Sequence, residues 1–339
     1  MKQINCPMVD WEQINPQEVN IDPKKLSKLN SVISKDYKNI CGMVIVKNGC
    51  IAYENYFDDY TPNDTVHIAS ATKSILSALI GIAIDKGDIK SIDQKVIDFF
   101  PEYLIKARDQ VKKEITIKHL LTMTAPYKYQ SEPWKKICTS PDWAIAALEF
   151  LGGRGSIGDF KYSTAGANIL SAIITRSTGK TALEYANENL FSPLGMNKLN
   201  NYKIRSETEY MEFFKGKYVT GWVVDPNNNN TGGWGLTLTS RDMAKFGLLY
   251  LNNGQWNDKQ IISKKWVKNS ITNTENHYGY LWWIVDEPEL SAYCALGDGG
   301  NVIFCIPDKS MVIAIASKFM PKPKDRMILI KEHILREFL

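Results

Sequence analysis

Residues 74–84 read SILSALIGIAI, a run that is apolar on every side of a helix. A helix of this kind has to be buried all round, because an amphipathic stripe would be enough for one lying at a surface. Only a large core can surround such a helix. The chain has 339 residues, which is long enough for such a core and favours either two domains or one large fold with an insertion.

Composition places the chain among ordinary globular proteins. Hydrophobic residues make up 44% and charged residues 23%, which excludes intrinsic disorder, collagen-like repeats and a multi-span membrane protein. The 41 Lys and Arg against 37 Asp and Glu leave a net charge of +4, too small and dispersed for a nucleic-acid binder. Residues 1–17 lack the apolar core of a signal peptide, and no run reaches the ~18 apolar residues of a membrane helix. We therefore expect a cytoplasmic protein without nucleic-acid or membrane partners; the oligomeric state stays open.

The cysteines indicate neither disulfides nor a metal site. They form no CxxC pair and no Cys/His cluster at metal-ligand spacing. We expect buried, reduced thiols and no metal or other cofactor. The six are Cys6, Cys41, Cys50, Cys138, Cys294 and Cys305.

Both ends of the chain predict strands and a helix. Asn48-Gly49 lies between two β-prone runs, which is the strongest short signal for a hairpin, because a type I′ turn needs positive φ at both central positions. The other elements predicted at the two ends are strands at 291–296, 301–306 and 310–317 and helices over 23–35 and from Pro323 onward.

The simplest assembly joins both ends in one antiparallel sheet with the two terminal helices packed on it. Sequential hairpin strands pair antiparallel, since parallel strands need crossovers of about a dozen residues or more. The predicted class is therefore α+β, with an α/β/α sandwich.

The middle of the chain predicts an inserted, mostly helical lobe. No internal repeat and no long linker divides it, so we expect a single domain over residues 1–339. Its sheet lobe comprises 1–65 and 272–339, and its helical lobe comprises 66–271. The clearest helix starts are Ser140-Pro141, Thr181 with Glu184, and Thr239 with Asp242.

The start of the apolar helix carries a candidate nucleophile and its base. Ser70 and Lys73 are three residues apart, so on a helix they share one face and can come within hydrogen-bond reach. Burial and the positive end of the helix dipole both disfavour a protonated amine, so Lys73 could accept the serine proton near neutral pH. Ser70 would then be an activated nucleophile. The alternative is that Ser70 caps the helix and Lys73 extends to water.

The SxxK pattern needs its context, because about one chance match is expected in a chain of this length. A second copy occurs at Ser177 and Lys180, where Gly179 at an apparent helix end would keep the two side chains off a common face. Tyr162 precedes that helix, in a turn from which its hydroxyl could project into a cleft and relay protons to a leaving group. A tyrosine that only anchors a loop by its ring is the alternative.

Together with other segments in the same order, these motifs resemble the serine β-lactamase and penicillin-binding-protein superfamily. Within it the chain is similar to class C β-lactamase-like hydrolases, and closest in motif style to nylon-oligomer (6-aminohexanoate-dimer) hydrolases and related esterases. The resemblance covers roughly residues 40–320. It is carried by SATK at 70–73, ITIKHLLTMTAP at 115–126, YST at 162–164, STG at 177–179, PLGM at 193–196, the segments GGWGLTLTSRDMAKFGLLYLNNG and YGYLWW, and GDGGNVIFCIP at 297–307.

The resemblance implies a role for each motif residue. Ser70 would be acylated, Lys73 would be its base, and Tyr162 would relay a proton to the leaving group. The oxyanion hole would combine the backbone N–H of Ser70 with one from the strand near Gly299–Asn301, which we assign to Gly300.

The third motif departs from the family pattern. Lys-Thr-Gly or His-Thr-Gly is usual there and helps to bind the substrate carboxylate, whereas this chain has Asp298. An acidic side chain would repel that carboxylate. We therefore expect β-lactams and D-alanyl peptides to be poor substrates and neutral or cationic esters and amides to be better. A plain turn role for Asp298 is the alternative.

Further substrate contacts are expected around these motifs. Thr164 replaces the asparagine of the common second motif, and so keeps a hydroxyl but loses the amide donor. Gly299 would approach the substrate beside Asp298. An apolar acyl pocket would draw on aromatic residues in the loops, namely Tyr127, Tyr129, Trp134, Trp222 and Trp234.

The leading hypothesis is a serine hydrolase that cleaves a small ester or amide through an acyl-enzyme at Ser70, of the carboxylesterase or 6-aminohexanoate-oligomer-hydrolase type. A β-lactamase or D-alanyl-D-alanine carboxypeptidase is one alternative, and a non-catalytic sensor that retains the fold is another. A Ser-His-Asp triad is not favoured, since no serine lies in a GxSxG elbow. Of the histidines His67, His119, His277 and His333, we expect His119 to be a hydrogen-bonded structural residue.

Overall fold

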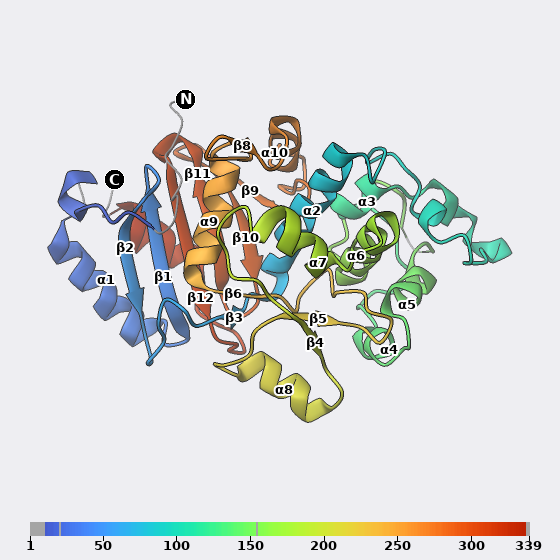
Figure 1. The fold of residues 1–339 in the computed structure, drawn as a ribbon, viewed down its shortest axis with the longest axis horizontal. Coiled ribbons are helices and arrows are strands. Elements are labelled where there is room, and N and C mark those ends of the chain that lie inside the picture. Colours follow the sequence, from blue (N-terminus) through green and yellow to red (C-terminus); the bar gives the residue numbers. More distant parts are fainter. Residues whose placement is uncertain (1–10, 20–21, 154, 337–339) are drawn as a thin grey trace.

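The computed structural model describes residues 11–19, 22–153 and 155–336, which leaves Cys6 outside the described residues. Within these residues, six strands form one antiparallel sheet in the order β2-β1-β12-β11-β10-β9 (Figure 1). Both ends of the chain thus contribute to one sheet, and the predicted α+β class is confirmed. The strands are β1 (Ile40–Lys47), β2 (Cys50–Tyr56), β9 (Trp283–Glu287), β10 (Leu290–Gly297), β11 (Asn301–Ile306) and β12 (Met311–Ser317).

The hairpin between β1 and β2 turns where the sequence predicts it. Lys47 pairs with Cys50, and the two residues between them, Asn48 and Gly49, have φ of 53° and 88°. Positive φ at both positions is what a type I′ turn requires.

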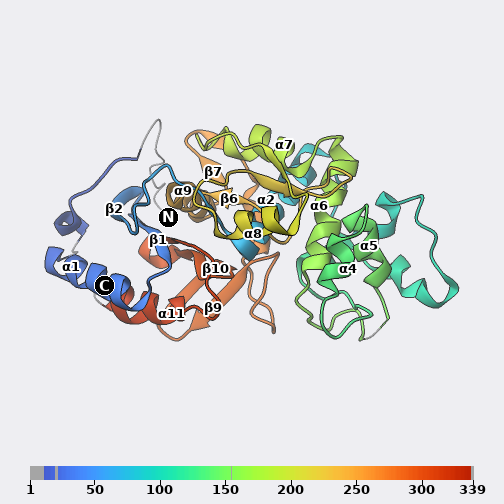
Figure 2. The ribbon, with the colours of Figure 1, turned by 90° about the horizontal axis from the view of Figure 1, so that it is seen from below.

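The sheet is covered on both faces (Figure 2). In β1, Met43 and Ile45 belong to one hydrophobic cluster, which includes residues of α1 (Pro23–Asp36) and of the C-terminal helix. Val44 and Val46 face the opposite way, into the cluster that contains α9 (Ser240–Leu251). This alternation follows from the two-residue period of a strand. The α/β/α layering is therefore confirmed, with α9 as a covering helix that the sequence analysis did not assign to the sheet.

Two helices begin later than predicted, because an aspartate caps each of them. The C-terminal helix begins at Arg326 rather than at Pro323, since Asp325 Oδ1 accepts the N–H of Met327 at 2.7 Å. In the same way, α5 (Trp143–Phe150) begins after Asp142 and not at Ser140. The starts predicted at Thr181 and Thr239 are confirmed, each hydroxyl accepting the N–H three residues on.

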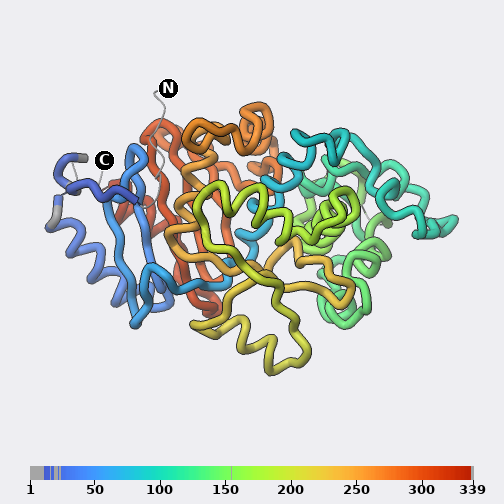
Figure 3. Tube along the Cα trace, in the orientation of Figure 1, coloured from blue at the N-terminus to red at the C-terminus, as the bar shows by residue number. Residues whose placement is uncertain are grey.

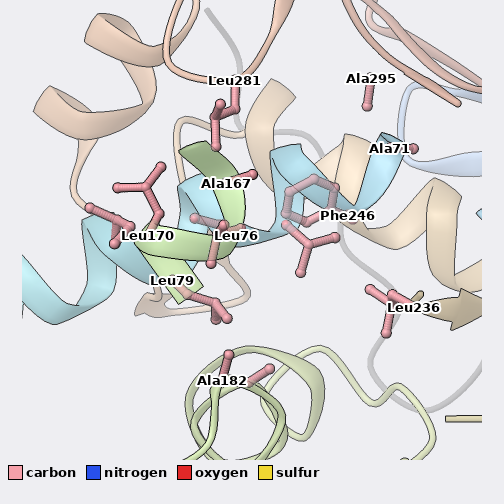
Figure 4. Packing of buried hydrophobic residues seen from close by; sticks show 14 of the residues in the cluster. Ala71, Leu76, Leu79, Ala167, Leu170, Ala182, Leu236, Phe246, Leu281 and Ala295 are labelled. Atoms are coloured by element: carbon pink, nitrogen blue, oxygen red, sulfur yellow. The ribbon is translucent and has the colours of Figure 1, made fainter. Parts of the chain in front are cut away.

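The apolar helix is α2 (Thr72–Lys86), and its residues are buried from Thr72 to Ala83. Figure 3 shows the chain leaving the sheet after β2, passing through the helical part and returning at β9. In Figure 4, Leu76 of α2 lies beside Ala167 of α6 (Thr164–Thr178). The expected burial on every side is confirmed.

Shorter elements complete the described chain. The remaining helices are η1 (Pro16–Val19), η2 (Ala69–Ala71), η3 (Val96–Phe99), η4 (Ala107–Glu114), α3 (Ile117–Leu121), α4 (Trp134–Cys138), α7 (Ala182–Ala186), η5 (Asn187–Phe191), α8 (Glu207–Lys215), α10 (Lys264–Ser270), η6 (Pro307–Lys309) and α11 (Arg326–Ile328), which continues as η7 (Leu329–Leu335). The remaining strands are β3 (Val66–His67), β4 (Asn201–Lys203), β5 (Trp222–Val224), β6 (Thr237–Leu238), β7 (Gln255–Trp256) and β8 (Lys259–Gln260).

Two negative findings apply to the described part of the chain. None of its helices combines the length and the apolar character needed to cross a membrane. It holds no group of three or more His, Cys, Asp or Glu side chains that could bind a metal ion.

The five cysteines in this part are all free thiols.

Candidate active site

Ser70 lies in the short turn η2, between β3 and α2. The strand that leads to it pairs with β6, and the N–H of Ile68 donates to Leu236 O at 3.0 Å. Ala69 has a φ of 49°, in the left-handed region that residues other than glycine rarely adopt. The sharp turn at Ala69 thus places Ser70 directly before the buried helix.

The amine of Lys73 is held close to Ser70. The residue is only 1% exposed, and its Nζ lies 3.1 Å from Ser70 Oγ. Nζ also lies 2.9 Å from Gly233 O and 3.3 Å from Thr164 Oγ1. No described carboxylate forms an ion pair with it. The amine of Lys73 thus contacts two hydroxyl groups and one backbone carbonyl, and one of those hydroxyls belongs to Ser70.

This geometry contradicts the alternative reading of the motif. Ser70 makes no capping hydrogen bond, since Ala71 occupies the N-cap position of α2. Lys73 does not extend to water, because α6 and the loop of Gly233 cover it. In the second SxxK copy, α6 ends at Thr178 and Lys180 instead forms an exposed ion pair with Glu188.

Tyr162 lies in the loop that leads into α6, where Ser163 Oγ caps the helix by accepting the N–H of Gly166 at 3.0 Å. Lys73 Nζ is 4.8 Å from the centroid of the Tyr162 ring. The ring stacks on Trp283 with centroids 5.8 Å apart, and its side chain is 37% exposed. The loop therefore brings the Tyr162 ring beside Lys73, although Tyr162 is not among the residues that line the pocket next to Ser70.

A pocket of about 390 Å³ opens beside Ser70. The predicted residues Thr164, Asp298, Trp134 and Trp234 line it, although they come from distant parts of the sequence. The other lining residues are His67, Ala69, Glu132, Tyr210, Met211, Phe214, Gly233 and Phe319.

Four predicted substrate contacts do not line this pocket. Tyr127 and Trp222 are 1% and 0% exposed, because they fill space between elements of the core. The indole N–H of Trp222 donates to Thr231 O at 2.7 Å. Tyr129 is also buried, with its hydroxyl 2.9 Å from Ser163 Oγ. Gly299 is buried too, and its carbonyl accepts the amide of Asn39 at 2.6 Å.

The oxyanion donor predicted at Gly300 is also corrected. Its N–H already donates to Gly297 O at 3.1 Å within the turn that follows β10. A Cβ on Gly297 would lie 2.1 Å from Ile68 O, so the end of β10 lies directly against the turn that holds Ser70. The next residue is Asp298, whose backbone N–H, like that of Ser70, has no hydrogen-bond partner among the described residues.

Glu132 is a pocket residue that the sequence analysis missed. Its Oε2 accepts the N–H of Thr164 at 3.1 Å, and its Oε1 accepts the N–H of Ala165. A carboxylate at a helix N-terminus is stabilised by the helix dipole and by the unpaired N–H groups there. Because the helix begins more than thirty residues after Glu132, no local pattern could have indicated this contact.

His67 is a second residue that lines the pocket and that no sequence pattern indicated. Its Nε2 accepts the N–H of Gly235 at 2.9 Å, and its ring packs edge-on against Phe213 and Phe214 with centroids 5.2 and 4.7 Å away. Burial lowers the pKa of His67 to about 3. The imidazole is therefore neutral and structural. His119 is structural as well, as expected, since its Nδ1 accepts the N–H of Thr116 at 3.0 Å.

We expect the His67 pKa to shape the acid stability of the protein. Between a pH of about 6.5 and a pH of about 3, the His67 imidazole is protonated in the unfolded chain but neutral in the folded protein. Stability should therefore fall as the pH drops through this window, by up to about 1.4 kcal/mol per pH unit from this group. Urea unfolding of wild type and His67→Gln at several pH values measures the slope. His277→Gln, at an exposed position, is the control; equal slopes in all three would contradict the prediction.

A methyl group at Gly233 should disturb the catalytic pair. A Cβ there would lie 2.4 Å from Thr164 Cγ2 and 3.1 Å from Lys73 Nζ. We expect Gly233→Ala to lower kcat/KM for an ester about tenfold or more, because small displacements of reacting groups are costly. Adding Thr164→Ser removes the clashing methyl and keeps the hydroxyl, so the double variant should recover part of the loss. A double variant no better than Gly233→Ala would exclude this cause.

Comparison with known proteins agrees with this architecture. The family model described as Beta-lactamase matches residues 32–335. Beta-lactamase-like protein 4 of Dictyostelium discoideum is 30% identical over 65% of this chain, but the chain spans only 42% of that protein. The 6-aminohexanoate-dimer hydrolase of Paenarthrobacter ureafaciens is 22% identical over 84% of this chain and 73% of its own length. Among solved structures, EstCE1 has the same fold, with a TM-score of 0.71. It is described as a hydrolase with promiscuous acyltransferase activity. The two sequences are 14% identical, and the match covers 94% of this chain and 99% of that chain. The family model thus covers nearly all of the sheet and of the helices inserted between its strands. This chain therefore belongs to the β-lactamase family.

Proposed function

We propose that this protein is a serine hydrolase that cleaves small esters or amides through an acyl-enzyme at Ser70. The observation that carries the proposal is the buried Lys73 amine, which lies 3.1 Å from Ser70 Oγ and forms no ion pair with a described carboxylate. A nucleophile next to a base that is itself held in place is the arrangement that acyl transfer needs.

The first step transfers the Ser70 proton to Lys73 while Oγ attacks the substrate carbonyl carbon. The backbone N–H groups of Ser70 and Asp298 would stabilise the negative oxygen of the tetrahedral intermediate, because both residues line the pocket and neither N–H has an acceptor among the described residues. Tyr162, beside Lys73, would pass the proton to the leaving group. Water then attacks the acyl carbonyl carbon and gives one proton to Lys73. The bond from that carbon to Ser70 Oγ breaks, Lys73 returns the proton to Oγ, and the carboxylic acid product leaves.

The charge of the pocket supports a substrate that lacks a carboxylate near the reacting bond. Glu132 and Asp298 both line it, and a like-charge contact in a cleft costs several kcal/mol. The name of the Paenarthrobacter relative also supports amide cleavage. We therefore favour an esterase or amidase over a β-lactamase or D,D-carboxypeptidase.

Labelling with a fluorophosphonate tests the proposed nucleophile. We expect one adduct, which peptide mass spectrometry would locate at Ser70; an active enzyme without that adduct would disprove the mechanism. Hydrolysis of short-chain nitrophenyl esters should exceed that of a chromogenic cephalosporin. Faster cephalosporin turnover would favour the β-lactamase alternative, and a long-lived adduct with very slow turnover would favour a sensor.

A further inference from the structure

The pocket beside Ser70 has an unusual combination of charge and wall chemistry. Among the described residues that line it, the charged ones are Glu132 and Asp298, and both are acidic. Lys73 is buried and does not line the pocket. The Asp298 side chain forms no ion pair or hydrogen bond with any described residue. One carboxylate at the site is thus left for a ligand.

The remaining wall is largely aromatic, and its rings form one connected group that we call the aromatic wall. Trp234 stacks on Phe214 at 5.4 Å and meets Trp134 edge-on at 5.5 Å. Phe214 also contacts Tyr210 at 4.5 Å and Phe319 at 6.1 Å. The aromatic wall consists of Trp134, Tyr210, Phe214, Trp234 and Phe319, all of which line the pocket.

Four separate segments supply this wall, so the tertiary fold builds it. Trp134 lies in α4, Tyr210 and Phe214 lie one turn apart in α8, Trp234 lies in the loop before β6, and Phe319 follows β12. Ring faces carry negative electrostatic potential and attract organic cations, most strongly where water is excluded. Asp298 is exposed and Glu132 is half-buried, and two carboxylates that line one cleft increase the local concentration of cations further.

We infer that the pocket binds an alkylammonium group, and that the preferred substrates are esters or amides that carry one. The preference among substrates rests on the proposed function, whereas the binding of the cation does not. The aromatic wall would enclose the methyl or methylene groups of the cation, and Asp298 would balance its charge. A neutral group of the same shape would gain the apolar contacts alone, and an anion would be repelled.

Binding of choline and of 3,3-dimethylbutan-1-ol tests the inference without any reaction, because the two differ in charge and hardly in shape. Calorimetry on the Ser70→Ala protein should give a Kd for choline about tenfold lower than that for the neutral alcohol. In Asp298→Asn this ratio should fall to about threefold or less. Asp258→Asn removes an exposed charge from the turn between β7 and β8, and so should keep the tenfold ratio. Equal Kd values for the two probes in the Ser70→Ala protein would overturn the inference.

Rates of ester hydrolysis provide a second test of the inference. With Ser70 present, kcat/KM for acetylcholine should exceed that for 3,3-dimethylbutyl acetate by about tenfold, and Phe319→Leu should reduce this ratio about threefold. If neither of these esters nor a nitrophenyl ester is cleaved but choline still binds selectively, the proposed function fails and the cation site stands. If both esters are cleaved equally fast and the two probes bind equally well, the hydrolase stands and the cation site is wrong.

Discussion

Replacing Ser70 by alanine should lower kcat/KM for a nitrophenyl ester by about 10³-fold or more and abolish fluorophosphonate labelling. No other described serine has a buried amine placed to take its proton, and removal of a nucleophile leaves only the catalysis that binding and the oxyanion donors supply. Stability should change little, since the side chain loses a single hydrogen bond, from Lys73 at 3.1 Å.

The second SxxK copy supplies a matched control for this variant. Ser177 Oγ donates only to Ile174 O, at 3.3 Å within its own helix. Ser177→Ala should therefore keep both the activity and the label. Retention of more than about a tenth of the wild-type kcat/KM by Ser70→Ala would show that the reaction does not pass through this serine.

Replacing Lys73 by methionine should lower kcat/KM by about 10²- to 10⁴-fold, the usual contribution of a positioned general base. Methionine has nearly the same length, so it fills the buried space, but Gly233 O loses its donor at 2.9 Å. A buried carbonyl without a partner costs about 1–3 kcal/mol, so a modest loss of stability is expected as well. Urea unfolding separates that loss from the change in rate.

The labelling rate isolates the chemical step. Lys73→Met retains Ser70, and so should react with fluorophosphonate far more slowly than wild type while still giving the Ser70 adduct. Lys180→Met, in the second copy, breaks only an ion pair with Glu188 in which both side chains are about half exposed. Such pairs contribute less than about 1 kcal/mol, so both its rate and its stability should match wild type. Equal labelling rates for Lys73→Met and wild type would exclude Lys73 as the base.

Local sequence patterns were sufficient for the elements themselves. Asn48-Gly49 predicted the hairpin, and the apolar run at 74–84 predicted the buried helix, because turn geometry and helical periodicity depend on residues close in sequence. Where the predictions failed, a nearby polar side chain moved a boundary. Asp325 and Asp142 each capped a helix that had been expected to start two or three residues earlier.

The sequence predicted only those parts of the site that depend on residues close together in the chain. Ser70 and Lys73 share a local spacing, and the loop before α6 placed Tyr162. The oxyanion donor depended on which N–H the turn after β10 leaves unpaired: Gly300 donates to Gly297, whereas Asp298 has no such acceptor among the described residues. No spacing in the sequence reveals that difference.

The sequence by itself determined the antiparallel sheet built from both chain ends, the buried helix and the serine and lysine at its start, since each depends on short-range spacing or on hydrophobic pattern. Tertiary structure alone decided which aromatic side chains face the pocket and which fill the core. It placed Trp134 and Trp234 on the wall and Tyr127 and Trp222 in the interior. It also brought Glu132 to the start of α6. The physical reason is that a pocket is a space left between packed elements, so its lining depends on contacts between residues far apart in the chain.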